Sequence, residues 1–341
     1  MDPIFLLVTA VVILALLFDF TNGFHDAGNA IATVVATKAL KPRTAVIYGA
    51  CFNFIGALMG TQVAATIGKG LVDQEGIQLV TVLSCLISAI AWNFLTWHRG
   101  LPTSSSHALV GSLLGATYFA SSDGFSHIHV DKVMQKVVWP MLGSPTTGFI
   151  IGFMIMAGLS WLLFKRSTKQ IKNVFSKLQI VSCGFMALSH GSNDAQKSMG
   201  IIALALTVAY PHIYLQENFE VPLWVVLSCA LVMGLGTLVG GWRIIRTLSG
   251  KLIKLQPVHG FAADATSATV ILTASHFGIP VSTTQVVTSS IMGVGTIKRM
   301  GVVRWGVITN ILWAWVLTLP GTFLFSGLIT LLIRGITSLF A

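Results

Sequence analysis

The chain has 341 residues, of which 54% are hydrophobic and only 9% are charged, and its mean hydropathy is +0.81. Soluble globular proteins carry roughly 25% charged residues, so this composition excludes an ordinary water-soluble enzyme and also the disordered and fibrous classes. The length suffices for about ten membrane crossings or part-crossings of ~20 apolar residues each, which predicts an all-α polytopic membrane protein.

The formal net charge is +10, from 21 Lys and Arg against 11 Asp and Glu. The basic residues form short clusters between apolar runs, as is typical of cytoplasmic loops beside an anionic membrane face. We therefore expect the lipid bilayer, and not nucleic acid, as a partner. The four cysteines lie singly in apolar stretches, without the spacing of a metal site or a disulfide framework. No metal ligands and no cofactor are expected.

The first apolar stretch, residues 4–40, would be ~54 Å long as one straight helix, whereas the hydrocarbon core is ~30 Å thick. It contains the sequence Asn22-Gly23-Phe24-His25-Asp26-Ala27. We expect the helix to break at this Asp motif, where freed backbone carbonyls would join the side-chain oxygens.

Two motifs occur twice, in the same order. The Asp motif at 23–27 returns at 191–195, and a Gly-Pro-Ser/Thr motif at 100–105 returns at 278–283. This pattern predicts a duplicated unit, with a first transmembrane repeat at 1–164, a basic cytoplasmic linker at 165–177 and a second repeat at 178–341.

The charges that follow the two Asp motifs differ in sign. Lys38, Lys41 and Arg43 follow the first motif, whereas residues 211–222 after the second contain two Glu and no Lys or Arg. Basic loops stay in the cytoplasm, so the two repeats are expected to have opposite orientations in the membrane.

Along the chain, basic loops are assigned to the cytoplasm and acidic loops to the outside. These assignments are consistent with each other only if residues 77–120 and 258–297 each enter and leave the membrane on the same side. We therefore expect two re-entrant helical hairpins, with tips at Gly100–Thr103 and Gly278–Ser282, where Gly and Pro interrupt the helix. Both termini would then lie outside. The predicted fold is an inverted-topology repeat with two re-entrant hairpins and broken helices.

Asp26 and Asp194 occupy equivalent places in the two repeats, at membrane depth. A carboxylate there costs at least ~2.5 to 3.5 kcal/mol, so its default interpretation is functional. The alternative is that these residues cap half-helices or pair with Lys197. For two further membrane-depth acids, Asp19 and Asp264, function and capping stay equally open. The expected cation-coupling residues, for a proton or a hard cation such as sodium, are Asp26, Asn29, Asp194, Asn193, Asn22 and His25.

The hairpin tips supply hydroxyls and free backbone N–H groups at the first turn of a helix, which together attract an anion. The alternative is that these residues only cap the helices. Lys197 either contacts the anion or neutralises Asp194. The expected substrate-binding residues are Thr103, Ser104, Ser105, Ser106, Ser282, Thr283, Thr284, Gln285, Lys197 and Gln196.

These motifs resemble those of one family. Asn22-Gly23-Phe24-His25-Asp26-Ala27-Gly28-Asn29-Ala30 and His190-Gly191-Ser192-Asn193-Asp194-Ala195-Gln196-Lys197 resemble the two signature repeats of the inorganic phosphate transporter (PiT) family, and both tips are similar to its hairpin motifs. The resemblance covers essentially the whole chain. It implies a cation-coupled symporter in the cell membrane that holds inorganic phosphate between the Asp motifs and the tips.

The sodium-coupled members of that family carry Gly-Ala-Asn-Asp followed by Val-Ala-Asn-Ala in both repeats. Here Phe24-His25 replaces Ala-Asn in the first repeat, and Gln196-Lys197-Ser198 replaces Ala-Asn-Ala in the second. The chain therefore resembles low-affinity bacterial members that couple to protons and carry metal–phosphate complexes. We expect proton coupling ahead of sodium coupling, and a homo-oligomer is left open.

Three other functions compete with phosphate symport. An intramembrane hydrolase is disfavoured, because the chain has no Gly-x-Ser-x-Gly elbow and a contiguous Ser-Ser-His does not place a nucleophile against its base; no enzyme activity is expected. An anion channel would need no coupling site, and flux against a gradient distinguishes it. Sulfate or another oxyanion is the alternative substrate, although a carboxylate that accepts a substrate proton favours phosphate.

Overall fold

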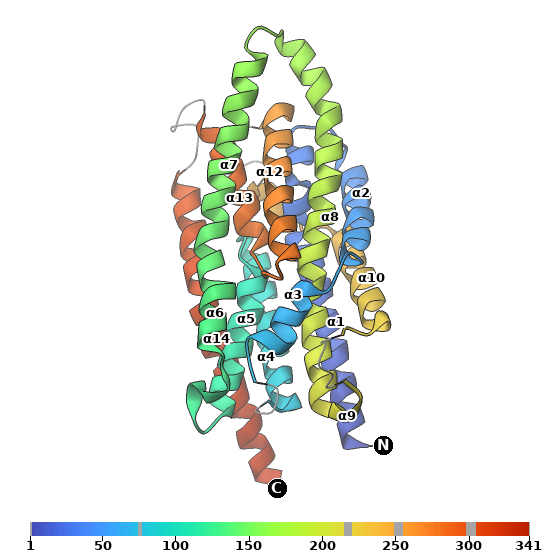
Figure 1. The fold of residues 1–341 in the computed structure, drawn as a ribbon, viewed down its shortest axis with the longest axis vertical. Helices are drawn as coiled ribbons and strands as arrows, with labels where there is room; N and C mark the ends of the chain where they lie inside the picture. Colours follow the sequence, from blue (N-terminus) through green and yellow to red (C-terminus); the bar gives the residue numbers. More distant parts are fainter. Residues whose placement is uncertain (1, 74–76, 215–219, 249–254, 298–304, 341) are drawn as a thin grey trace.

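The computed structural model describes residues 2–73, 77–214, 220–248, 255–297 and 305–340. Within these ranges almost every segment is helical, and the extended structure is limited to one isolated bridge between Val72 and Ile128. The helices form an elongated bundle and most of them run along its long axis (Figure 1). The all-α class predicted from the composition is confirmed.

The helices follow one another in two comparable series. The first series comprises α1 (Pro3–Ala36), α2 (Pro42–Ala57), α3 (Gln62–Ala65), η1 (Thr66–Gly70), α4 (Leu79–Arg99), α5 (Ser105–Ala120), η3 (Gly124–His127), α6 (Val130–Val133), η4 (Met134–Val138) and α7 (Trp139–Leu163). The second comprises α8 (Thr168–Ala209), α9 (Pro211–Tyr214), α10 (Leu223–Val239), α11 (Trp242–Arg246), α12 (Pro257–His276), α13 (Thr283–Thr296) and α14 (Trp305–Phe340).

Several helices have the length and apolarity of membrane spans. Among the described residues there are four, Pro3–Ala36, Leu79–Arg99, Val130–Leu163 and Gly306–Ser338, and a fifth if α2 and the α3–η1 segment, bent by 64°, form one span. Large apolar side chains also cover the outside of the bundle; Trp161 is 78% exposed and Phe164 is 71% exposed. An apolar exterior of this kind faces lipid, which agrees with a multi-pass membrane protein.

Two helical hairpins enter the bundle from opposite ends. Helices α4 and α5 start and finish at the end that holds the termini, whereas α12 and α13 do so at the other end (Figure 1). Gly100 and Gly278 end the first helix of each hairpin, and both have φ +64, a backbone conformation that glycine adopts without strain. The hairpins and their turning points are those that the sequence predicts.

Each hairpin turn is held by a threonine from the opposite half of the chain. Thr247, which follows α11, donates to the carbonyl of Gly100 at 3.0 Å. Thr66 of η1 donates to the carbonyl of Gly278 at 2.6 Å. The longer helices interlock in the same way, because α5 packs on α14, α13 on α7, α2 on α8 and α10 on α1. The two halves therefore form one body.

The predicted helix breaks are wrong. Helix α1 runs without interruption through Asp26, and α8 runs without interruption through Asp194. The glycines in these motifs serve close packing instead. A Cβ on Gly23 would lie 2.7 Å from the Met233 carbonyl oxygen of α10, and a Cβ on Gly191 would lie 2.1 Å from an α2 carbonyl oxygen. Side chains on continuous helices, without freed backbone carbonyls, thus form the centre.

Both termini lie at one end of the bundle, and the turn between α7 and α8 lies at the other (Figure 1). Helix α8 begins at Thr168, after a capping box in which Ser167 and Gln170 satisfy each other's backbone N–H groups. Most of the basic segment 165–177 therefore forms the first turns of α8. Its charges are concentrated at the end away from the termini.

Candidate functional site

The carboxylates of the two Asp motifs meet in the middle of the bundle, where α1 packs beside α8. One ligand atom each from Asp26, His190 and Asp194 lies within 4.8 Å of the other two, and all three side chains are buried. Two acids 168 positions apart in sequence therefore share one small volume. The oxygen and nitrogen atoms of these side chains are close enough together to hold a cation.

Asp26 is contacted by both hairpin tips. Its Oδ2 accepts a hydrogen bond from Ser105 Oγ of α5 at 2.8 Å, and its Oδ1 accepts one from Thr284 Oγ1 of α13 at 3.3 Å. His25 Nδ1 also lies 2.7 Å from Oδ1. One buried carboxylate thus connects the first helix of the chain to the start of the second helix in each hairpin.

Asp194 has a different set of partners. Lys197 Nζ, one turn along α8, lies 2.7 Å from its Oδ1, and both side chains are fully buried. Its Oδ2 accepts hydrogen bonds from Asn22 Nδ2 and Thr283 Oγ1, each at 3.4 Å, and lies 3.4 Å from His190 Nε2. Of the two roles left open for Lys197, the structure shows the ion pair with Asp194.

Amide side chains surround these carboxylates. Asn29 Nδ2 donates to Thr284 Oγ1 at 2.8 Å and to Thr283 Oγ1 at 3.3 Å, so α1 holds the second tip at a further point. Some amide oxygens are buried and accept no hydrogen bond from any described residue; they are those of Asn22, Asn29, Asn193 and Gln285. A buried oxygen that lacks a hydrogen-bond donor needs another partner. Because these oxygens lie near carboxylates, a cation is again the partner that fits.

The tip hydroxyls divide into two groups. Ser104 Oγ accepts from the backbone N–H of His107 at 3.1 Å, and Ser282 Oγ accepts from that of Gln285 at 3.3 Å. These two serines are therefore helix N-caps. For them, the structure shows the capping role that was the alternative to anion binding. The hydroxyls that reach the carboxylates belong to the next positions along each helix.

Two further tip residues differ in their contacts. Ser106 Oγ donates to the carbonyl of Val281 at 2.9 Å, so the tips are in direct contact. Thr103 Oγ1 is buried and has no hydrogen-bond partner among the described residues.

Two predicted site residues also hold helices together. Gln196 Oε1 accepts from the backbone N–H of Val63 at 2.7 Å, and its Nε2 donates to the Ser192 carbonyl, so its amide holds α3 against α8. Asn193 Nδ2 donates to Ser275 Oγ at 2.8 Å, which fixes α8 against the last turn of α12.

Residues 22–326 of the chain match the phosphate transporter family. The chain belongs to this family. It is 46% identical to the "Probable low-affinity inorganic phosphate transporter" of Bacillus subtilis, over 94% of this chain and 95% of that protein. It is 43% identical to the protein of the same name from Rhizobium meliloti, over 95% of this chain and 96% of that protein. The family resemblance of the motifs is confirmed, and the family is one of transporters, not enzymes.

The fold is also that of a solved structure, "The sodium-dependent phosphate transporter". The two share a TM-score of 0.88 at 24% sequence identity, with 96% of this chain and 99% of the other covered. This similarity establishes the arrangement of the helices.

In this phosphate transporter family member, a polar stripe runs from the centre toward the α7–α8 end. Asn29, Thr33 and Thr37 are four residues apart and so lie on one face of α1. Thr33 Oγ1 donates to Asp264 Oδ1 of α12 at 2.7 Å, and Thr37 Oγ1 donates to Gln179 Oε1 of α8 at 2.7 Å. Asp264, for which the sequence left function and capping open, therefore belongs to this stripe.

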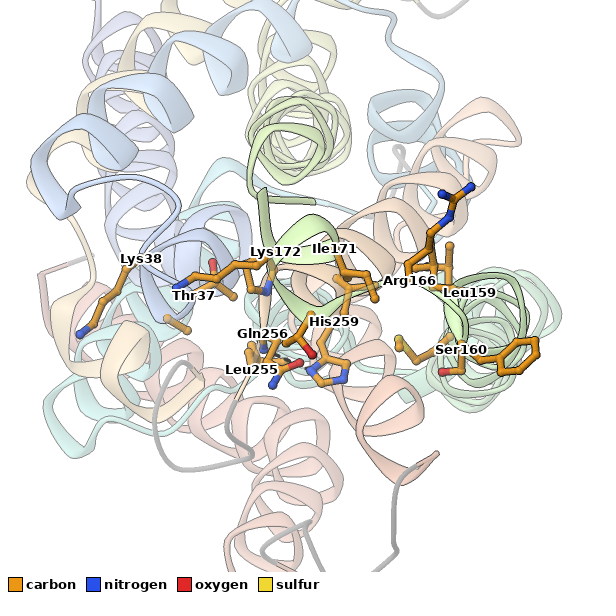
Figure 2. A pocket seen from close by; sticks show the side chains of 17 residues that line it. Thr37, Lys38, Leu159, Ser160, Arg166, Ile171, Lys172, Leu255, Gln256 and His259 are labelled. Carbon is orange, nitrogen blue, oxygen red and sulfur yellow. Dashed lines mark hydrogen bonds between the residues drawn. The ribbon is translucent and has the colours of Figure 1, made fainter. Parts of the chain in front are cut away.

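The stripe ends at a cavity of about 590 Å³ enclosed by the ends of α1 and α7 and the beginnings of α8 and α12. Figure 2 shows Lys38 and Thr37 at one side of the cavity, Ser160 and Arg166 at the other, and His259 between them. Thr37 lines it, as does Lys38, and among the described residues no acidic side chain does. Sequence analysis did not predict this cavity, because four separate segments form its wall. The basic run at 165–177, which contributes Arg166 and Lys172 to the lining, was the feature of the sequence that could have indicated it.

Proposed function

We propose that this chain is a secondary active transporter that carries inorganic phosphate across the cell membrane together with a cation, with the proton favoured over sodium. The observation that carries the proposal is the convergence of both hairpin tips on a buried pair of carboxylates. Ser105 and Thr284 reach Asp26, and Thr283 reaches Asp194. Membership of the phosphate transporter family supports the choice of substrate.

The tips provide what a tetrahedral oxyanion needs. Helices α5 and α13 both begin at the centre, and a helix N-terminus combines a partial positive charge with unpaired N–H donors. The hydroxyls of Ser105, Thr283 and Thr284 add donors on the two sides of the acid pair. A phosphate between the tips would accept hydrogen bonds from both halves of the chain at once.

The carboxylates favour phosphate over sulfate. Phosphate carries at least one proton near neutral pH, so it can donate a hydrogen bond to Asp26 or Asp194. Sulfate is fully deprotonated there and offers only acceptors, which a buried carboxylate repels. When sulfate occupies the site, the carboxylate of Asp26 or Asp194 receives no hydrogen bond from the substrate. The site therefore disfavours sulfate, because a buried acceptor without a partner is costly.

Coupling to a proton follows from the charges at the centre. An anion that approaches buried carboxylates is repelled strongly, because a site shielded from water screens charges weakly. His25 Nδ1 and Asp26 Oδ1 lie 2.7 Å apart and both side chains are buried, so one proton can be held between this nitrogen and this oxygen. A proton that enters with phosphate and resides on this pair would offset the repulsion.

We also propose an orientation and a route. The α7–α8 end carries the basic segment 165–177 and faces the cytoplasm, so both termini lie outside. Phosphate released from the centre would pass Thr33 and Asp264 and leave through the cavity that Thr37 lines. The cations around that cavity favour an anion on its way out.

Transport by purified protein in liposomes tests the proposal. An inward proton gradient should make radiolabelled phosphate accumulate above its equilibrium level, a sodium gradient alone should add little, and sulfate should not accumulate. Repeating the assay with and without Mg²⁺ shows whether a metal–phosphate complex is carried. Uptake that only equilibrates across the membrane, or equal accumulation of sulfate, would contradict the proposal.

A further inference from the structure

Lys197 is one of the largest fully buried side chains in the described part of the chain, and none of its surface is exposed. Its Nζ lies 2.7 Å from Asp194 Oδ1, and no other described residue provides Nζ with a hydrogen-bond acceptor. A lysine is almost never fully buried unless it is paired. Its ammonium group is therefore held at the centre by one carboxylate.

Other buried acidic side chains lie around Lys197. Besides Asp194, the side chains of Asp19 and Asp26 interact electrostatically with it. Two histidines also lie near this group; His190 is 3.4 Å from Asp194, and His107 of α5 interacts electrostatically with Lys197. Among the described residues, Asp194 is thus the acid that contacts the ammonium group, and two further buried acids interact with it electrostatically.

Without the ammonium group, this volume would contain buried acids and no fixed positive charge. Such a volume is stable only when its acids are protonated or a cation enters it, because an unpaired buried charge is very costly. The amide oxygens of Asn22 and Asn193, which accept no hydrogen bond from the described residues, add oxygen ligands of the kind that hard cations prefer. An ammonium group carries the same single positive charge as a sodium ion and concentrates it at one point.

We propose that Lys197 is a tethered cation that occupies the cation position beside Asp194, so that this carboxylate requires no sodium ion during transport. This inference rests on the proposed function, since it names what determines the coupling ion. Because the ammonium group cannot leave the protein, the charge at Asp194 is balanced in every state. The exchangeable cation is then the proton on the His25–Asp26 side of the centre.

Sodium binding by purified protein tests the inference without any transport. We expect no saturable binding of ²²Na⁺ to the wild type, and saturable binding to Lys197→Asn, which replaces the ammonium group with an amide oxygen. Lys197→Arg keeps the charge and should bind none. Lys132→Asn, which removes an exposed lysine of α6, is the matched control and should behave as the wild type. Lys197→Met, which keeps the length of the side chain without its charge, should also gain sodium binding.

Phosphate uptake provides the second measurement. Wild-type uptake should be the same in sodium and in choline, whereas Lys197→Asn in choline should lose about 100-fold or more, as expected for a buried acid that has lost its partner. Sodium should restore most of this loss. Elution as a single species in size-exclusion chromatography identifies variants that fold.

Saturable sodium binding by the wild type, or its absence from folded Lys197→Asn and Lys197→Met, would overturn the inference. The wild-type measurement decides against it even if no neutral variant folds. Sodium-driven uptake by the wild type would overturn the role of Lys197 and leave phosphate transport intact. Conversely, a wild type that carries no phosphate would overturn the proposed function, while the binding measurement would still decide the role of Lys197.

Discussion

Ser105 Oγ lies 2.8 Å from Asp26 Oδ2 and donates a hydrogen bond to it, although the two residues are 79 positions apart. The contact joins the first residue of α5 to the middle of α1. Because Thr284 reaches the other oxygen of the same carboxylate, both hairpin tips are hydrogen-bonded to Asp26. Under the proposed function, an anion that takes up these hydroxyls would free the carboxylate to accept a proton.

Asp26→Asn and Asp194→Asn should each abolish phosphate uptake while the protein remains in the membrane. The amide keeps the shape of the side chain, but it can neither take up a proton nor pair with Lys197 as an anion. Uptake by cells or vesicles, normalised to the amount of protein in the membrane, is the measurement. Asp123→Asn, in an exposed loop, should leave uptake unchanged, and wild-type uptake by either buried variant would remove that aspartate from the mechanism.

The tip residues should separate into binding residues and caps. Ser105→Ala and Thr284→Ala should each raise the apparent KM for phosphate about tenfold, the effect of one lost hydrogen bond to a charged group. Ser104→Ala and Ser282→Ala should instead lower thermal stability by about 1 kcal/mol through loss of an N-cap. Thr146→Ala, on the exposed face of α7, serves as the control for both measurements. If Ser105→Ala and Thr284→Ala leave the KM unchanged, these two hydroxyls do not bind phosphate.

The meeting of acids and tips is predicted from the sequence because both motifs occur twice in the same order, and two copies of one unit are expected to bring such motifs together. The sequence does not predict that α1 and α8 continue through their motifs, because a glycine that allows close helix packing looks the same in sequence as one that ends a helix. Gly23 shows this, since its missing side chain admits a carbonyl of α10.

The contact between Thr33 and Asp264 also could not be predicted. The two residues are 231 positions apart in the sequence. Asp264 has an apolar counterpart in the first half of the chain, so the repeated motifs do not indicate which residue Asp264 contacts. The cavity in Figure 2 also could not be predicted from the sequence, because its wall is formed by segments that are far apart in the chain.

Gly56→Ala should destabilise the protein. A Cβ at this position would lie 2.0 Å from the carbonyl oxygen of Leu188, so α2 and α8 would have to separate, at a cost of roughly 1–3 kcal/mol for overpacking. The thermal midpoint in detergent should fall by several degrees. Gly158→Ala, whose added Cβ would meet nothing within 4 Å, is the matched helical control and should not lower it. Equal midpoints for the two variants would argue against this close crossing.

The proposed orientation can be measured with a membrane-impermeant thiol reagent. In a background where the exposed Cys51 is replaced by serine, Ser160→Cys should be labelled only from the cytoplasmic side, because it lines the cavity at the α7–α8 end. Asp123→Cys lies between α5 and α6, in the segment that Figure 1 shows at the end that carries the termini, and should be labelled only from outside. The reverse pattern would show that the protein has the opposite orientation.

The position of the bound anion tests the central claim most directly. Arsenate has the shape and charge of phosphate, and arsenic gives an anomalous diffraction signal, so crystals grown with arsenate locate the substrate analogue. We predict an anomalous peak between the two hairpin tips, within hydrogen-bonding distance of Ser105 or Thr284 and beside Asp26 and Asp194. A peak confined to the cavity that Thr37 and Lys172 line, with none between the tips at saturating arsenate, would contradict the account.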